Sequence, residues 1–194
     1  MKPEREAEFE TLQTMYGSTR RIAAEILVGA AGSRWWNVEK TRRRDGEVVL
    51  FVRRLDGSLL LHTKDFYPPG ALRVPSGGIK PGEAVLAALW RELAEETGLE
   101  VEIEQLVAVV DFAIRIGEVS MAYPSYSFLL REVSGELKTS DQDERISAFA
   151  QVPFEDLCRV AASLEGLSGE WREWGKFRAI PHRLVAEAMG FGSS

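Results

Sequence analysis

Cysteine and histidine are scarce in this chain, which has one cysteine, Cys158, and two histidines among its 194 residues. A single cysteine excludes an intrachain disulfide and is typical of a reducing compartment, so we expect a cytoplasmic protein. Cys158 falls in a predicted helix, where a buried apolar role is favoured over that of a nucleophile. Neither His62 nor His182 has a partner at a spacing typical of a metal site.

Long hydrophobic runs and an excess of positive charge are also missing. No apolar run approaches the roughly 20 residues that span a bilayer, and the first ten residues, MKPEREAEFE, are too charged for a signal peptide. The net charge of −6 argues against a general nucleic-acid-binding protein, since such proteins carry a basic surface. We therefore expect no membrane and no nucleic-acid partner. A hydrophobic content of 45% is sufficient for one full core and a single domain.

The most informative segment runs from Gly77 to Leu99 and reads GGIKPGEAVLAALWRELAEETGL. Its first glycines and its proline are turn residues. Residues 83–97 contain neither Gly nor Pro, which predicts a helix that Gly98 ends in a left-handed conformation. Glu92, Glu95 and Glu96 stand at i, i+3 and i+4, so they are neighbours on one arc of that helix.

Carboxylates at this spacing repel one another by roughly 3 kcal/mol per pair at about 5 Å and an effective dielectric near 20, before screening. A divalent cation would reverse that sign, and carboxylate oxygens are the ligands that Mg²⁺ and Mn²⁺ prefer. The alternative is a solvated, glutamate-rich helix. The glycine loop at its fixed distance upstream favours the metal site.

The segment resembles the Nudix box of Nudix hydrolases, with every fixed position present. A glycine is followed after five residues by Glu83, after seven more by Arg91-Glu92-Leu93, then by Glu95-Glu96 and Gly98-Leu99, each after one intervening residue. The resemblance implies an α/β fold, the Nudix-type α/β/α sandwich with a mixed sheet. It also implies an enzyme that uses Mg²⁺ or Mn²⁺ and water to cleave a nucleoside diphosphate linked to another group.

The resemblance assigns roles within the box. Glu92, Glu95 and Glu96 are the implied metal ligands, and Glu95 is alternatively an outer group behind the ligands. Gly77 and Gly98 shape the loop and the helix end, and Glu83 organises the loop. Arg91 either holds a box glutamate by an ion pair, which we favour, or binds a substrate phosphate.

Two expectations concern residues beside the box. Many relatives read Pro-Gly-Gly where this chain reads Pro75-Ser76-Gly77, and the residue before the first box glycine often gives the metal its backbone carbonyl, so Ser76 is expected in that role. Relatives take their general base either from the box helix or from a later loop. The catalytic candidates are therefore Glu92, Glu95 and Glu144, the last from the acidic loop 140–144. An exposed acidic turn is the alternative for that loop.

Substrate identity is left open, because the proline and tyrosine that mark two subfamilies about sixteen residues past the box are missing from residues 113–116. A nucleotide sugar, a dinucleotide or a nucleoside triphosphate all remain candidates. Lys64 and Arg73 flank the glycine loop and could contact phosphate, and Tyr126 could stack on a base, each with a structural role as the alternative. A non-catalytic nucleotide or ADP-ribose-type ligand sensor is the second function, which three retained and mutually repelling glutamates argue against.

The remaining pattern predicts an N-terminal helix and extension over residues 1–44, packed on a Nudix hydrolase domain over 45–194 within a single domain overall. The basic residues Lys40, Arg42, Arg43 and Arg44 predict a solvated loop or strand end, with a phosphate-contacting patch as the alternative. Segment 171–182, rich in aromatic and basic residues, either packs on the core, closes the pocket or forms a homodimer contact.

We expect further secondary structure in the following segments: a helix at 3–15; strands at 47–53, 58–63, 72–75, 102–116, 120–132 and 146–152; and helices at 153–164 and 171–189, the last interrupted at Pro181.

Overall fold

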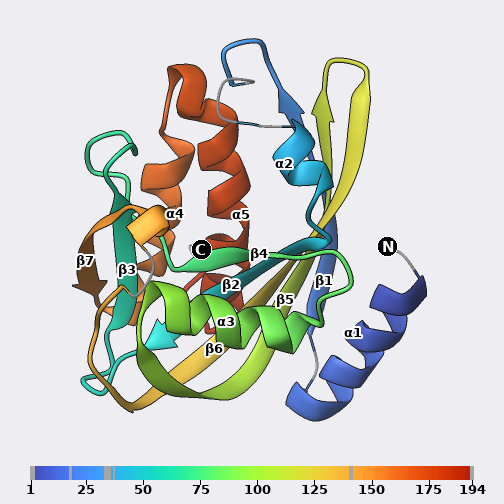
Figure 1. The fold of residues 1–194 in the computed structure, drawn as a ribbon. Helices are drawn as coiled ribbons and strands as arrows, with labels where there is room; N and C mark the ends of the chain where they lie inside the picture. Colours follow the sequence, from blue (N-terminus) through green and yellow to red (C-terminus); the bar gives the residue numbers. More distant parts are fainter. Residues whose placement is uncertain (1–2, 18, 33–35, 37, 140–141, 193–194) are drawn as a thin grey trace.

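A mixed β-sheet forms the centre of the protein (Figure 1). The computed structural model describes residues 3–17, 19–32, 36, 38–139 and 142–192. Within these residues the strand order is β1-β5-β6-β2-β3-β7, and β4 pairs with β2. β1 is parallel to β5 and β2 is parallel to β6, whereas the other pairs are antiparallel. The strands are β1 (Arg20–Val28), β2 (Gly46–Arg53), β3 (Leu59–Lys64), β4 (Ser76–Ile79), β5 (Leu99–Ile116), β6 (Val119–Gly135) and β7 (Ile146–Val152).

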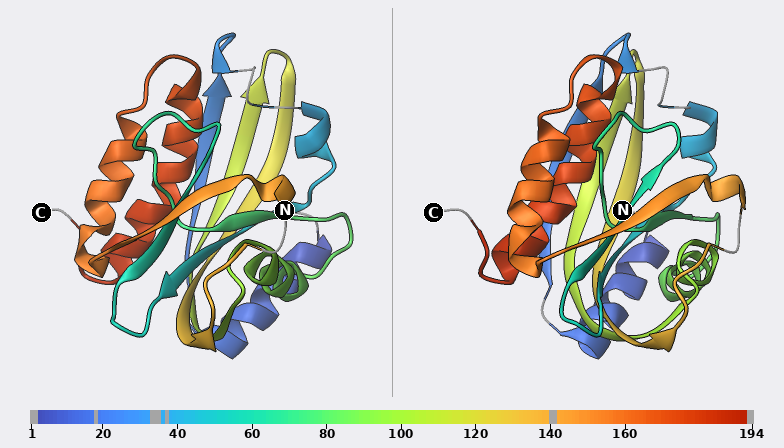
Figure 2. Two further views of the ribbon diagram at one scale, coloured as in Figure 1. Left: turned by 60° about the vertical axis from the view of Figure 1, so that its left-hand side comes forward. Right: turned by 90° about the vertical axis from the view of Figure 1, so that its left-hand side faces the viewer.

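Helices cover both faces of this sheet, as Figure 2 shows edge-on, with α4 and α5 on one side and α3 and α1 on the other. The predicted α/β/α sandwich with a mixed sheet is therefore confirmed. The helices are α1 (Pro3–Tyr16), α2 (Val38–Arg42), α3 (Val85–Glu96), α4 (Leu157–Glu165) and α5 (Arg172–Ala188). No helix among the described residues is both long and apolar enough to cross a membrane.

The central strand β2 contributes side chains to two hydrophobic cores, one on each face of the sheet. Its side chains alternate, so that Val48 and Leu50 join the hydrophobic cluster beneath α3 while Val49 and Phe51 join the cluster beneath α4 and α5. A strand covered on both faces is apolar along its whole length, as the sequence GEVVLFVR is from its third to its seventh residue.

Residues before 45 are part of this architecture. Phe9 and Leu12 of α1 are buried in the cluster beneath α3, and β1 pairs along its length with β5. This N-terminal extension therefore adds a sheet strand as well as the expected helix.

Two expectations about secondary structure are wrong. Pro181 does not interrupt the last helix, because α5 runs unbroken from Arg172 to Ala188 with Phe177, Leu184 and Val185 buried on either side of the proline. That packing holds the two halves in line and overrides the local cost of proline. The expected strand at 72–75 is also missing, since Arg73 makes only an isolated bridge to His62 and β4 begins after Pro75.

Candidate active site

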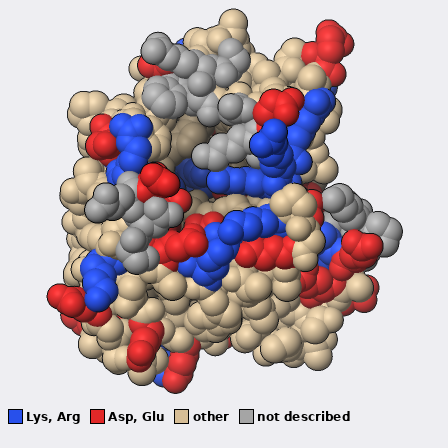
Figure 3. Space-filling model, in the orientation of Figure 1, with Lys and Arg blue, Asp and Glu red and all other residues tan. Residues whose placement is uncertain are grey.

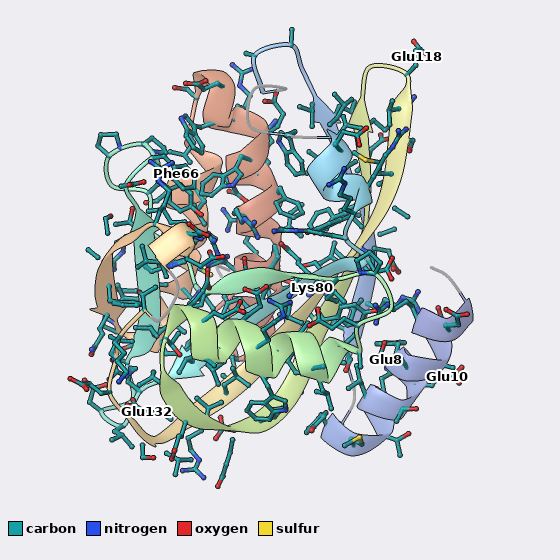
Figure 4. The ribbon with its side chains drawn as sticks, viewed as in Figure 1. Glu8, Glu10, Phe66, Lys80, Glu118 and Glu132 are labelled. Atoms are coloured by element: carbon teal, nitrogen blue, oxygen red, sulfur yellow. The ribbon has the colours of Figure 1, made fainter. Side chains whose placement is uncertain are left out.

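Helix α3 carries the candidate site and is fixed at both ends. Val85 and Leu89 are fully buried against the sheet, which orients the opposite, acidic face. The helix has no side-chain cap of its own at Ala84. Instead, the Val85 amide donates to Oε1 of Glu8 in α1 at 2.6 Å (Figure 4). Gly98 has a φ of +65° just beyond the helix, the left-handed conformation that the sequence predicts there.

Strand β4 lies against the acidic face of α3. A Cβ atom at Gly77 would overlap the carboxyl group of Glu92, so only glycine leaves room for that side chain. The backbone amide of Ser76 donates to Oε2 of Glu96 at 3.0 Å. The backbone of β4 thus lies against two carboxylates, Glu92 at Gly77 and Glu96 at Ser76.

Three carboxylates converge beside this strand. Glu92 and Glu96 come from α3, one helical turn apart, and Glu144 comes from a 3₁₀ turn just before β7. One carboxylate oxygen of each lies within 4.8 Å of the others. Glu96 is fully buried, and its Oε1 accepts no hydrogen bond from any described residue, although the Lys64 ammonium lies 3.3 Å away. Three carboxylates around a buried oxygen, with one ammonium beside them, fit a site for a hard divalent cation.

The electrostatics of the cluster differ between its members. Burial raises the pKa of Glu92, and it raises the pKa of Glu96 to about 7. Burial acts in the same direction on Glu144, but the hydrogen bond and the charge of Lys64 outweigh it and lower the pKa of Glu144 below the ordinary value. Near neutral pH without metal, Glu96 therefore holds a proton for part of the time while Glu144 is ionised.

Arg91 ties the glycine loop to the helix. Its guanidinium donates to both carboxylate oxygens of Glu83, at 2.8 and 2.9 Å, and to the carbonyl of Gly78 at 2.9 Å. It also donates to Glu92 at 2.7 Å and to Glu95 at 3.1 Å. These bonds join Glu83 and the Gly78 carbonyl on the loop side to Glu92 and Glu95 on the helix. Glu95 lies beside this guanidinium, outside the cluster of three, with its side chain 34% exposed.

A cavity of about 430 Å³ opens above the cluster. Figure 3 shows the hollow in this face, with a band of Lys and Arg along it and acidic side chains beneath. Five of the lining residues are cationic and three are acidic, although the whole chain has a net charge of −6. The lining residues are Arg44, Lys64, Phe66, Tyr67, Arg73, Ser76, Gly77, Gly78, Glu92, Asp143, Glu144, Arg145, Trp174 and Arg178. A cationic pocket in an acidic protein favours an anionic ligand.

Two of the three predicted substrate residues line this cavity, and the third does not. Lys64 contacts Glu96 and Glu144. Arg73 is 3% exposed and donates to Tyr67 and Ser76 at 2.8 Å each, and none of the described carboxylates lies within ion-pair distance of it. Tyr126 is fully buried in the hydrophobic cluster beneath α3. The prediction that Tyr126 stacks on a base is therefore wrong, because its side chain faces the core.

Helix α5 and the loop after β3 supply further residues of the cavity. Trp174 and Arg178 come from α5, and Trp174 packs against Tyr67 with ring centroids 4.7 Å apart. Phe66 lies on the loop after β3, on the side of α5, with its centroid 4.9 Å from that of Tyr67 (Figure 4). The aromatic and basic density of segment 171–182 was the only local signal for Trp174 and Arg178. Arg44 was expected in a solvated loop or strand end, with a phosphate-contacting patch as the alternative; it follows α2, which ends at Arg42, and it lines the cavity.

Comparison with known proteins gives a family. The NUDIX domain matches residues 42–174. The chain is 33% identical over 95 residues to the human 8-oxo-dGDP phosphatase NUDT18, covering 49% of this chain and 27% of that protein. It is 28% identical over 116 residues to an ADP-ribose pyrophosphatase of Methanocaldococcus jannaschii, covering 60% of this chain and 66% of that protein. The chain thus spans less than two thirds of the curated relatives it matches.

Among solved structures, a NUDIX hydrolase from Nitrosomonas europaea superposes with a TM-score of 0.47 at 22% identity, over 61% of this chain and 78% of that one. The family match extends from Arg42 to Trp174 and so includes the glycine loop, α3 and Glu144. Together with the complete box, it confirms the predicted resemblance, and the chain belongs to the Nudix family.

Proposed function

We propose that the protein is a metal-dependent hydrolase that cleaves the diphosphate linkage of a nucleoside diphosphate derivative, such as a nucleotide sugar, a dinucleotide or a nucleoside triphosphate. The observation that carries this proposal is the convergence of Glu92, Glu96 and Glu144 beneath a cavity whose lining is mainly cationic. The names of the relatives, a phosphatase and a pyrophosphatase, agree with this reaction class. The single cysteine supports a reducing compartment such as the cytoplasm.

The three carboxylates are the proposed ligands of Mg²⁺ or Mn²⁺, together with the backbone carbonyl of Ser76. When bound, such an ion neutralises diphosphate oxygens and makes water a better nucleophile. The burial of Glu96 within 4.8 Å of two other carboxylates supports this assignment, because a divalent cation would offset negative charge that Lys64 offsets only in part. Glu95 is proposed as an outer group that helps to hold Arg91, which also donates to the ligand Glu92.

Glu144 has two carboxylate oxygens, of which one is assigned to the ion and the other is our choice for the general base. Its side chain is 28% exposed and lines the cavity, so it can reach a water molecule there. Lys64 keeps it ionised at neutral pH by lowering its pKa, and an ionised carboxylate can accept the proton of the attacking water. Glu92 is the alternative base, and it is the less accessible of the two, since its side chain is 7% exposed and accepts a hydrogen bond from Arg91.

Arg73 is the proposed phosphate ligand. A buried guanidinium without a described carboxylate partner is costly to desolvate, and a phosphate group in the cavity would compensate its charge. Lys64, placed between Glu96 and Glu144, would stabilise negative charge at the same end of the cavity.

The test is a product-release screen with Mg²⁺ or Mn²⁺ over nucleotide sugars, dinucleotides and nucleoside triphosphates, with coupled phosphatase or pyrophosphatase detection. We expect turnover of at least one class, lost in Glu96→Gln and largely kept in a Glu100→Gln control that lies beyond the site on β5. Binding of nucleotides without turnover of any would favour the ligand-sensor function instead. Wild-type rates in Glu96→Gln would contradict the site assignment.

A further inference from the structure

Helix α1 bonds the backbone of the turn that leads from β4 into α3. Nη2 of Arg5 donates to the carbonyl of Glu83 at 2.7 Å, and Oε1 of Glu8 accepts from the amide of Val85 at 2.6 Å. Ala84, between these two positions, is the N-cap of α3 and has no side-chain oxygen to accept from the helix amides. The beginning of α3 therefore relies on a carboxylate from another helix, and Figure 4 shows Glu8 between α1 and this end of α3.

Arg5 is a buried cation that several acceptors hold in place. It is 7% exposed, and besides the Glu83 carbonyl it contacts the carboxylate of Glu8 and, at 3.5 Å, that of Asp45. Asp45 also accepts from the amide of Gly82 in the same turn, at 3.1 Å. A guanidinium suits this place, because its rigid fork of donors can bind two carboxylates and a carbonyl together.

Helix α1 is itself anchored to the sheet by contacts that do not involve the turn. Phe9 is buried in the hydrophobic cluster beneath α3. Arg21 of β1 donates to both carboxylate oxygens of Glu6, at 2.5 and 3.0 Å, and to Asp111 of β5 at 2.6 Å. Its guanidinium also lies 4.9 Å from the ring centroid of Phe9. The sheet thus sets the position of α1, and α1 in turn holds the turn before α3.

The same turn is bonded to the carboxylate cluster on its other side. The carboxylate of Glu83 accepts from Arg91, which donates to Oε1 of Glu92 at 2.7 Å. Glu92 is one of the three clustered carboxylates. Glu83 therefore has its carbonyl held by Arg5 and its carboxylate held by the arginine that holds Glu92. Only two residues separate the Arg5 guanidinium from a carboxylate of the cluster.

We infer that α1 is a positioning element of the active site, in which Arg5 and Glu8 fix the turn before α3 and, through Glu83 and its partner Arg91, the carboxylate of Glu92. Both positioning residues lie outside the part of the chain that matches the NUDIX domain. The inference rests on the proposed function in one respect, that Glu92 is a metal ligand. Losing a group that orients a ligand typically costs 10- to 100-fold in metal affinity, and Arg5 and Glu8 act from further out, so a smaller loss of roughly 3- to 10-fold is expected.

The test compares four variants of the full chain. Arg5→Ala and Glu8→Ala each remove one bond to the turn, whereas Glu8→Gln keeps an oxygen that can accept from the Val85 amide. Glu6→Ala is the matched control, because it removes a contact between α1 and the sheet but none with the turn. The Mn²⁺ dissociation constant is measured by electron paramagnetic resonance. Hydrogen–deuterium exchange in EDTA reports the turn itself, and circular dichroism checks that each variant is folded.

We expect the Mn²⁺ dissociation constant to rise by roughly 3- to 10-fold in Arg5→Ala and in Glu8→Ala, and to stay within about twofold of the wild type in Glu8→Gln and in Glu6→Ala. Amide exchange over residues 82–88 should become faster in the two alanine variants at Arg5 and Glu8, with exchange in α4 unchanged. Either of these two variants alone is sufficient for the test.

Faster exchange in the turn with unchanged Mn²⁺ affinity would overturn the inference, because α1 would then stabilise the fold without positioning the site. An equal loss of affinity in Glu6→Ala would also overturn it, since the effect would not pass through the turn. A wild-type chain that binds no Mn²⁺ would overturn the proposed metal site and the inference together, which sets that failure apart from the other two.

Discussion

Replacing Glu96 with glutamine should stabilise the metal-free protein in a pH-dependent way. Glu96 is fully buried, and burial raises its pKa from 4.5 to about 7. At roughly 1.4 kcal/mol per pH unit, this difference amounts to about 3 kcal/mol. Because the folded pKa lies above the unfolded one, the stability tied to the protonated form is complete below about pH 4.5 and is lost as the pH rises through about 7.

Glutamine stays neutral throughout this range, so metal-free Glu96→Gln should exceed the wild type at pH 8 by up to about 3 kcal/mol. For a chain of this size that is a Tm higher by roughly 6–12 °C, and the difference should vanish near pH 4.5. The assay is thermal unfolding followed by circular dichroism in EDTA at both pH values. Adding Mg²⁺ should reverse the order at pH 8, because the ion binds only the folded wild type.

Glu95→Gln is the matched control. Glu95 directly precedes Glu96 in the helix, but its side chain lies outside the cluster of three carboxylates and is a third exposed. We expect its Tm to differ little between the two pH values. A Glu96→Gln protein that is less stable than the wild type in EDTA at pH 8 as well as at pH 4.5 would show that ionisation of Glu96 does not destabilise the folded state.

Three further predictions concern the surroundings of the cluster. In Gly77→Ala the new methyl group displaces the Glu92 carboxylate, so turnover should fall by roughly 10- to 100-fold with the circular dichroism spectrum unchanged, and a rate within about twofold of wild type would contradict the packing. Tyr126→Phe keeps the buried ring, so KM should stay within about twofold in steady-state kinetics, and a tenfold rise would return Tyr126 to the substrate site. Glu8→Ala removes the acceptor of the Val85 amide and should lower the free energy of unfolding by about 1 kcal/mol in urea titration, whereas the exposed Glu4→Ala should have little effect.

The parts of the site that sequence could predict are those set by local rules. The helix from Val85 to Glu96, its end at Gly98 and the shared face of Glu92 and Glu96 follow from spacing within about twenty residues. The expectation for Glu144 depended on the family resemblance. In the folded chain, Lys64 at the end of β3 contacts both Glu144 and Glu96, and no local sequence pattern predicts these two contacts.

The parts that sequence could not predict depend on long-range packing. Nothing in the sequence distinguishes Arg44 from the neighbouring arginines. Its position over Gly78 depends on the pairing of β4 with β2. Tyr126 lies on β6, which is buried on both faces in this region, so alternation does not separate a residue facing the core from one facing a cavity. The interruption predicted at Pro181 is wrong for a related reason. The burial of Phe177 and Val185 on either side of the proline keeps α5 continuous.

The most direct test of the central claim, that Glu92, Glu96 and Glu144 form one divalent-metal site, is a Mn²⁺ titration of the full chain followed by electron paramagnetic resonance. We expect at least one ion bound per wild-type chain, and a loss of Mn²⁺ affinity of roughly 10-fold or more in Glu96→Gln and in Glu144→Gln but not in Glu95→Gln. Equal Mn²⁺ affinity in the wild type and in Glu96→Gln would contradict it.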